Sequence, residues 1–559
     1  MRPRPPRART MAALAAGLFR VAAFASCGRA PQTTVPNLRP SSPSPSSTAI
    51  SPAAPTAPLL TGPLAQVACA LPTEQLTRIW RGYERRASGE ITIVPQEPNF
   101  VAGGISHAGP WPYLQRVPMF WYGPGIVHSG TYERPVTLAD VAPTIAGLIG
   151  FDFSAPDGRP LWEALEPAAR PPRLVVTVVW DAGGRDVLAT WPNNWPTLRR
   201  LIPRGAWFEH ATVGSSPSVT APDHATLGTG AFPDHHGVID NTFRQQGKLR
   251  MAWYGGPSVL HTPTLADLYD VARGSRPLVG AVGTSIWHLG MIGHGSMWPG
   301  GDRDLAVMHA GAEPGNPWNL PPGDAPFFYL PTYANSVPGF AADVRRTDAS
   351  DGLLDGRWWG TPIDELENGF NTPARLPWET RLVGQMIQRE GFGGDRVPDL
   401  LYVNYKMIDH IEHTFDMNSI EMRETLEVQD RVLGQLVRLL DRKVGQGRWV
   451  MALVADHGST PDPRASGAFP ISEQVLLDDL RRAFDDGDGR SAIEAVEPTY
   501  VYVDIAELHQ AGYRVGDVAR YLTGYTERDN GGHRDAPVFA AAFPSSYLPR
   551  LACLSQGRA

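Results

Sequence analysis

Lysine, cysteine and long apolar runs are scarce in this chain of 559 residues. Lysine occurs only at positions 248, 406 and 443, so arginine carries nearly all of the positive charge. The formal net charge of −7 excludes a general electrostatic attraction to nucleic acids or to anionic membranes. No apolar run approaches the ~20 residues of a membrane-spanning helix, which argues against a transmembrane anchor. The 42% of apolar and 19% of charged residues are typical of a chain that buries a large core.

Residues 1–27 have the pattern of an export signal, with a basic start and an apolar run over 11–19. Residues 24–27 read Phe-Ala-Ser-Cys and resemble a bacterial lipobox, which would place a lipid on Cys27. The alternative is a signal peptide that is cleaved nearby. We therefore expect an exported protein, either a cell-surface lipoprotein or a secreted or periplasmic one. Residues 28–60 are rich in Pro and Ser and predict a disordered linker before a folded domain over 61–559.

Short apolar runs alternate with helical patterns along the folded part of the chain. Continuous apolar runs of this kind predict an α/β fold with a largely parallel central sheet flanked by helices. The expected strands are Leu174–Trp180, Trp449–Ala455, Leu400–Asn404, Leu278–Val282, Ile91–Val94 and Val117–Tyr122, and the clearest helices are Leu138–Ile149 and Ser419–Leu440. The stretch 305–395 is rich in Gly, Pro and Trp and predicts an irregular insertion that caps the site, or else a surface excursion.

Carboxylate and imidazole side chains follow three of the expected strands. Asp181 follows the first of them, Asp456 and His457 follow another, and Asp409 and His413 follow a third at a spacing of one helical turn. Ligands of α/β sheets bind beyond the carboxyl ends of the strands. Each Asp by itself could be a helix cap, but five such residues at three strand ends favour a site for Zn²⁺.

Thr220 stands where a helix is expected to begin, with Pro222 in its first turn. Free backbone N–H groups at a helix start favour a phosphate beside this hydroxyl. In isolation Thr220 would be interpreted as a helix cap. Beside metal ligands it becomes a candidate nucleophile, because zinc lowers the pKa of a hydroxyl and activates the water that clears an intermediate.

These motifs resemble the alkaline phosphatase superfamily, in the branch of nucleotide pyrophosphatase/phosphodiesterases and Thr-nucleophile alkaline phosphatases. The matching segments are Asp181-Ala182-Gly183, Thr220-Ala221-Pro222-Asp223-His224, Thr229-Gly230 through His236-Gly237, Asp409 with His413, and Asp456-His457-Gly458. The resemblance implies two Zn²⁺ ions, one held by Asp181, Asp456, His457 and Thr220, and the other by Asp409 and His413. It also implies that Asn241 binds a phosphoryl oxygen.

The second zinc of this family needs one more histidine, which lies downstream of Asp-His-Gly in relatives. The downstream candidate here is His533, which lacks the family's surrounding pattern. The pattern occurs upstream instead, around His107, and continues through Tyr122-Gly123-Pro124-Gly125. We therefore expect a circularly permuted chain, with the family's C-terminal piece at about 71–165, and His107 as the ligand with His533 as the alternative.

Permutation also predicts that the two ends of the domain meet. Of the three cysteines, Cys69 lies near the start of the domain and Cys553 near its end. An exported protein can keep a disulfide, so we expect one between Cys69 and Cys553, two separate thiols being the alternative.

The resemblance further bears on the substrate. Thr-nucleophile monoesterases of this family carry Ser-x-Lys-x-Arg, where the two cations bind the extra charge of a monoester. Here Ser285 is followed by Trp287 and Leu289 at those places, which favours phosphodiesters or nucleotide pyrophosphates. The alternative is an alkaline phosphomonoesterase in which Arg303 or Lys406 supplies the charge. A sulfatase is disfavoured because Thr220 and His224 replace its Cys or Ser and its Arg, and a non-catalytic surface lipoprotein is disfavoured because all ligands are kept.

Overall fold

The computed structural model describes residues 59–102, 104–167, 169–309 and 317–555. The predicted export signal with Cys27, and nearly all of the predicted linker, lie outside the described residues. Within those ranges, no helix has both the length and the apolar character that crossing a membrane would require.

Nine strands form the central sheet, in the order β13-β12-β11-β16-β6-β17-β3-β7-β4. The first six run parallel to their neighbours, whereas β3 pairs antiparallel with both β17 and β7. The predicted α/β fold with a largely parallel sheet is therefore confirmed. In sheet order the strands span Phe328–Tyr329, Asp304–Val307, Val279–Val282, Asp399–Tyr405, Leu174–Trp180, Trp449–Val454, Met119–Tyr122, Ala206–Phe208 and Gly130–Tyr132.

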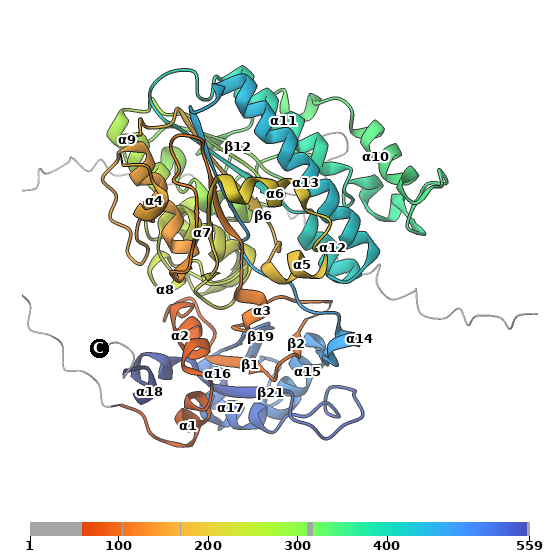
Figure 1. Ribbon diagram of the computed structural model, residues 1–559. Coiled ribbons are helices and arrows are strands. Elements are labelled where there is room, and N and C mark those ends of the chain that lie inside the picture. Colours follow the sequence, from red (N-terminus) through yellow and green to blue (C-terminus); the bar gives the residue numbers. More distant parts are fainter. Residues whose placement is uncertain (1–58, 103, 168, 310–316, 556–559) are drawn as a thin grey trace, which may run out of the picture. The chain divides into compact units, whose positions relative to one another are not determined.

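Both faces of this sheet are covered, which is why its strands are apolar throughout. On β6, Val175 and Val179 pack into one core, and Val176 and Val178 pack into a second core on the opposite face. Figure 1 shows the helices that cover the sheet. The first core includes α4 (Val141–Ile149), α7 (Thr220–Thr229) and α9 (Leu265–Arg273), and the second includes α5 (Arg185–Thr190), α6 (Pro196–Leu201), α11 (Arg375–Glu390), α12 (Met407–Phe415) and α13 (Ile420–Leu440).

A second, four-stranded sheet joins the two ends of the described chain. Strand β1 (Ile91–Pro95) pairs antiparallel with β20 (Tyr500–Val503) on one side and with β21 (Phe539–Pro544) on the other. β19 (Ile493–Glu497) completes the sheet. The predicted disulfide is present, because Cys69 at the end of α1 (Pro63–Cys69) is bonded to Cys553. Its Cα atoms are 5.8 Å apart although 484 positions separate the residues in sequence.

The stretch 305–395 is less irregular than predicted. Its first residues belong to β12, and β13 follows in the same sheet, so this part extends the central sheet. The 16-residue helix α11 then packs against α13, and α10 (Phe340–Asp348) packs against α11. The strands were missed because β12 and β13 are four and two residues long, too short to show a periodic pattern.

Candidate active site

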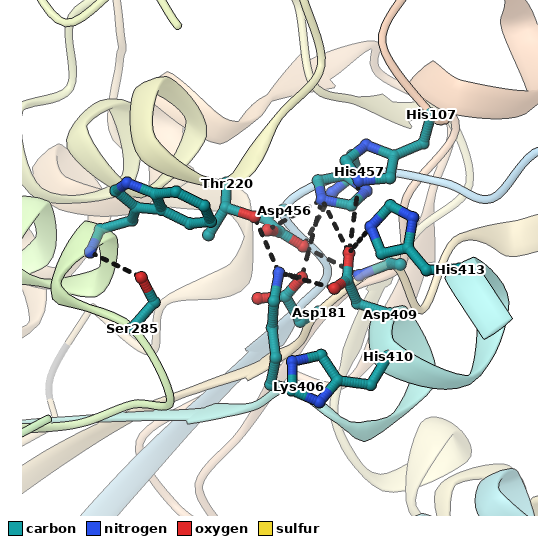
Figure 2. A network of polar contacts seen from close by, with 12 residues as sticks. His107, Asp181, Thr220, Ser285, Lys406, Asp409, His410, His413, Asp456 and His457 are labelled. Carbon is teal, nitrogen blue, oxygen red and sulfur yellow. Dashed lines mark hydrogen bonds and ion pairs between the residues drawn. The ribbon is translucent and has the colours of Figure 1, made fainter. Parts of the chain in front are cut away.

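The predicted site residues gather beyond the carboxyl ends of β6, β16 and β17, as Figure 2 shows. Asp181 directly follows β6, and the next residue, Ala182, has a positive φ of 58°. This sharp turn directs the Ala182 N–H to Asp456 Oδ1 at 3.1 Å. Asp456 and His457 follow β17 after a single residue. The turn after β6 therefore fixes two of the predicted ligands against each other.

Thr220 is the first residue of α7, as predicted, and is almost fully buried. The N–H of Ala221 donates to Asn241 Oδ1 at 2.9 Å, so the two segments are joined at the helix start. This bond engages the carbonyl oxygen of Asn241 and leaves its Nδ2 as the donor that the side chain can offer to a ligand. A hydroxyl, an amide donor and a helix N-terminus thus converge at one place.

Asp181, Asp456 and His457 form the first cluster of candidate ligands, and all three are fully buried. His457 Nε2 lies 3.3 Å from Asp456 Oδ2 and 3.6 Å from Asp181 Oδ1. Such separations suit ligands that surround one ion at the bond lengths of zinc, which are near ~2.0–2.2 Å for nitrogen and oxygen.

Asp409, His413 and His107 form the second cluster. Asp409 Oδ1 lies 3.3 Å from His107 Nε2 and 3.5 Å from His413 Nε2. Asp409 and His413 both belong to α12, where one turn places them on the same side. The ring of His107 stacks on that of His457 with 3.7 Å between centroids, which brings the two clusters side by side.

The tautomers of the three histidines favour a bound cation in each cluster. In each ring Nδ1 donates to a backbone carbonyl, so Nε2 is the nitrogen that faces a carboxylate. The acceptors are Ser218 O for His107, Ile105 O for His413 and Gly458 O for His457. Asp409 Oδ1, Asp456 Oδ2 and His457 Nε2 are buried without a hydrogen-bond partner among the described residues. Buried groups that face one another in this way favour a positive charge between them. Burial acts to lower the pKa of His413, but Asp409 and Glu412 outweigh it and raise that pKa to about 9, so a proton competes with a metal ion at this nitrogen.

Burial and neighbouring charge also favour cation binding at the first cluster. Burial and the nearby charge of Asp181 raise the pKa of Asp456 to about 8. Burial lowers the pKa of His457 to about 4, so this imidazole is neutral and able to act as a ligand. Burial also acts to raise the pKa of Asp181, but Lys406, His288 and His457 together outweigh it and hold that pKa below its usual range.

Sequence reasoning assigned no role to the side chains that hold the other oxygen of Asp181. Asn404 Nδ2 donates to Asp181 Oδ2 at 2.9 Å, and His288 Nε2 lies 3.3 Å from the same oxygen. The N–H of Ser285 donates to His288 Nδ1, so Nε2 carries the proton and acts as a donor, not as a metal ligand. His288 and Asn404 therefore orient Asp181. The one sequence signal for Asn404 is that it is a polar residue inside the apolar strand β16.

Two candidate residues lie outside the site. His533 is exposed in a turn and belongs to none of the ligand clusters among the described residues, which leaves His107 as the better-placed histidine. Arg303 donates to the backbone carbonyls of Ala325 and Phe328, away from Thr220. Lys406, by contrast, lies within the site, with Nζ 2.8 Å from Thr220 Oγ1.

A family model described as type I phosphodiesterase/nucleotide pyrophosphatase matches residues 175–551, more than half of the chain. The chain belongs to this family. Membership confirms the predicted superfamily and the predicted class of enzyme, a phosphoric ester hydrolase of the phosphodiesterase/phosphatase type.

Two of the similar proteins are alkaline phosphatases. Alkaline phosphatase PafA of Elizabethkingia meningoseptica is 23% identical over 417 residues, which are 63% of this chain and 72% of the relative. Alkaline phosphatase PhoK of Sphingomonas sp is 23% identical over 338 residues, which are 55% of this chain and 59% of the relative. The crystal structure of wild-type PafA has a TM-score of 0.47 and 20% identity, covering 64% of this chain and 77% of the other.

Proposed function

We propose that this phosphodiesterase-family chain hydrolyses phosphoric diesters through a phosphothreonine intermediate on Thr220, with two zinc ions. The observation that carries the proposal is the meeting of a buried hydroxyl with two clusters of carboxylates and imidazole nitrogens. Asp181, Asp456 and His457, with Thr220, would hold one ion. His107, Asp409 and His413 would hold the other. Bound there, the ions would supply positive charge that favours an ionised hydroxyl and polarises the phosphoryl oxygens.

The remaining chemistry belongs to the side chains. Thr220 Oγ forms a bond to phosphorus while the bond to the leaving alcohol oxygen breaks and its electron pair departs with that oxygen. The alcohol then takes up a proton from solvent. Water attacks phosphorus in the second step, the bond to Thr220 Oγ breaks, and the hydroxyl regains a proton. Asn241 Nδ2 donates to a phosphoryl oxygen and stabilises the charge that develops there.

The preference for diesters rests on two apolar side chains. Trp287 is partly buried and Leu289 fully buried, and both pack against the core that includes α7. They stand where monoesterases of the family carry Lys and Arg. A dianionic monoester would lose two charge-assisted hydrogen bonds, worth roughly 1.5–3 kcal/mol each. Because Leu289 is fully buried in the core, Trp287 is the apolar side chain of this pair that could contact the second organic group of a diester.

The experiment compares hydrolysis of bis-p-nitrophenyl phosphate and p-nitrophenyl phosphate, with zinc and with chelator. We expect zinc-dependent turnover, faster with the diester. Thr220→Ala should abolish turnover and keep zinc bound. Thr226→Ala is the matched control, because this buried hydroxyl on the same helix contacts His236 instead of the ligands. Full activity of Thr220→Ala would refute the nucleophile, and faster monoester turnover would favour the alkaline phosphomonoesterase that the names of PafA and PhoK suggest.

A further inference from the structure

Lys406 lies at the centre of the site although it matches none of the family's motifs. Its Nζ is 2.7 Å from Asp181 Oδ1, 2.9 Å from Asp409 Oδ2 and 2.8 Å from Thr220 Oγ1. The ammonium group donates hydrogen bonds to Asp181 Oδ1 and Thr220 Oγ1 and forms an ion pair with Asp409. Figure 2 shows the side chain rising from below to meet all three. The group therefore joins one carboxylate of each ligand cluster to the predicted nucleophile.

This arrangement is held firmly by the fold. Lys406 follows directly on β16 and precedes α12, so its backbone lies between a central strand and a ligand-bearing helix. Its side chain is only 5% exposed, and a buried ammonium is stable only with anionic partners. Asp181 and Asp409 supply these anionic partners. Lys406 is thus a fixed positive charge beside a hydroxyl.

The two other lysines, which are both among the described residues, lie elsewhere in the fold. Lys248 and Lys443 lie on other elements, and Lys443 Nζ contacts Gln388 at the surface. The segment after Ser285, which supplies two cations in monoesterases of the family, offers Trp287 and Leu289. The ammonium group in the site of this chain therefore comes from Lys406, which follows β16, and not from the segment after Ser285.

We propose that Lys406 is a catalytic residue that donates a hydrogen bond to Thr220 Oγ1 and stabilises its negative charge during attack on phosphorus. The proposal rests on the proposed function of Thr220 as the nucleophile. No proton leaves Lys406 in this role, because its charge acts as a fixed partner of the oxygen.

A competing explanation is that the ammonium only fills the place of a cation in the metal-free protein. The two explanations differ in what removal of the charge does to zinc binding and to turnover. A mere substitute for an ion would weaken zinc binding by competition, so its removal would strengthen that binding and leave turnover unchanged. A catalytic group would affect turnover by the full protein with zinc bound.

The test compares Lys406→Met with wild type and with Lys443→Met as the matched control for loss of a lysine charge. Turnover of bis-p-nitrophenyl phosphate, zinc content per chain and melting temperature are measured for each. We expect Lys406→Met to lose about 10²–10³-fold in kcat while it keeps the zinc content of wild type. Propylammonium should restore part of the activity of Lys406→Ala, a response that a purely structural role does not predict.

Each other outcome overturns the proposal in a different way. Turnover of Lys406→Met within a few-fold of wild type refutes the role in catalysis, and stronger zinc binding with unchanged turnover identifies a substitute for an ion. Loss of zinc from Lys406→Met and Lys406→Ala, without rescue, assigns the residue to site assembly alone. If wild type with zinc hydrolyses neither ester, the proposed function itself fails, and the proposal for Lys406 fails with it.

Discussion

Replacement of His107 by Ala tests the half of the site that the front of the chain supplies. Because His107 is one of three side chains in the second cluster, the variant keeps Asp409 and His413 as ligands at that position. Loss of a group that merely orients a ligand costs ~10–100-fold in metal affinity, and loss of a ligand itself should exceed this. We therefore expect zinc at this position to bind at least ~100-fold more weakly, with the first cluster still occupied.

The weaker zinc binding of His107→Ala also reduces the stability that zinc confers on the folded protein. At a fixed excess of zinc, a ~100-fold weaker dissociation constant removes about 2.7 kcal/mol of ligand-induced stabilisation. Zinc content after dialysis against a chelator should fall from two ions to one per chain, and the zinc-dependent rise in melting temperature should shrink. Without zinc, His107→Ala and wild type should melt within a few degrees of each other.

His533→Ala provides the control, because His533 is exposed in a turn. It should bind zinc and turn over substrate as wild type does. Two tightly bound ions in His107→Ala, or loss of one ion from His533→Ala, would refute the assignment of His107 and with it the strongest argument for permutation.

Two further predictions concern buried charges away from the ligands. Arg375 Nε donates to Glu379 Oε1 at 2.5 Å and both side chains are fully buried. Glu379→Gln should therefore lower the free energy of unfolding by ~3–5 kcal/mol, as measured by denaturant titration. A double variant Arg375→Met/Glu379→Leu that is no more stable than the single variant would contradict this prediction. Burial and the charge of Asp240 raise the pKa of Glu497 to about 9. The folded protein therefore holds a proton that the unfolded chain releases above pH ~4.5, and stability falls as the pH rises from there to about 9. The melting temperature of Glu497→Gln should exceed that of wild type at pH 9 and equal it at pH 5. The same difference in melting temperature at both pH values would contradict this prediction.

The central sheet could be predicted because its strands are buried on both faces. Leu174–Trp180 is β6 with unchanged bounds. The strand before Asp456 is one residue shorter than expected, and β16 extends the expected Leu400–Asn404 by one residue at each end. Because these strands are parallel neighbours, the residues at their carboxyl ends lie close together. The grouping of the candidate ligands could therefore be predicted from the sequence. The very short strand β12 could not be predicted, because four residues carry no periodic signal.

The side chains around the ligands were harder to predict for a physical reason. Ser285 is followed by Trp287, His288 and Leu289, and the sequence alone does not tell which of them points toward Asp181. In the structure it is His288. Its Nδ1 accepts a hydrogen bond from the backbone N–H of Ser285, and its Nε2 lies near Asp181 Oδ2. Likewise, the contact of Lys406 with Thr220 joins residues 186 positions apart and depends on the position of two helix starts.

The pairing of the chain's two ends is compatible with the predicted circular permutation. β3 pairs with β17, the strand that leads to Asp456, so the front segment continues the sheet as a downstream segment would. β1 lies between β20 and β21, and the Cys69–Cys553 disulfide fixes the same region covalently. A metal site depends only on where its ligands lie and not on their order along the chain. We infer that these contacts replace covalent continuity, so that His107 can complete the second cluster from the front of the chain.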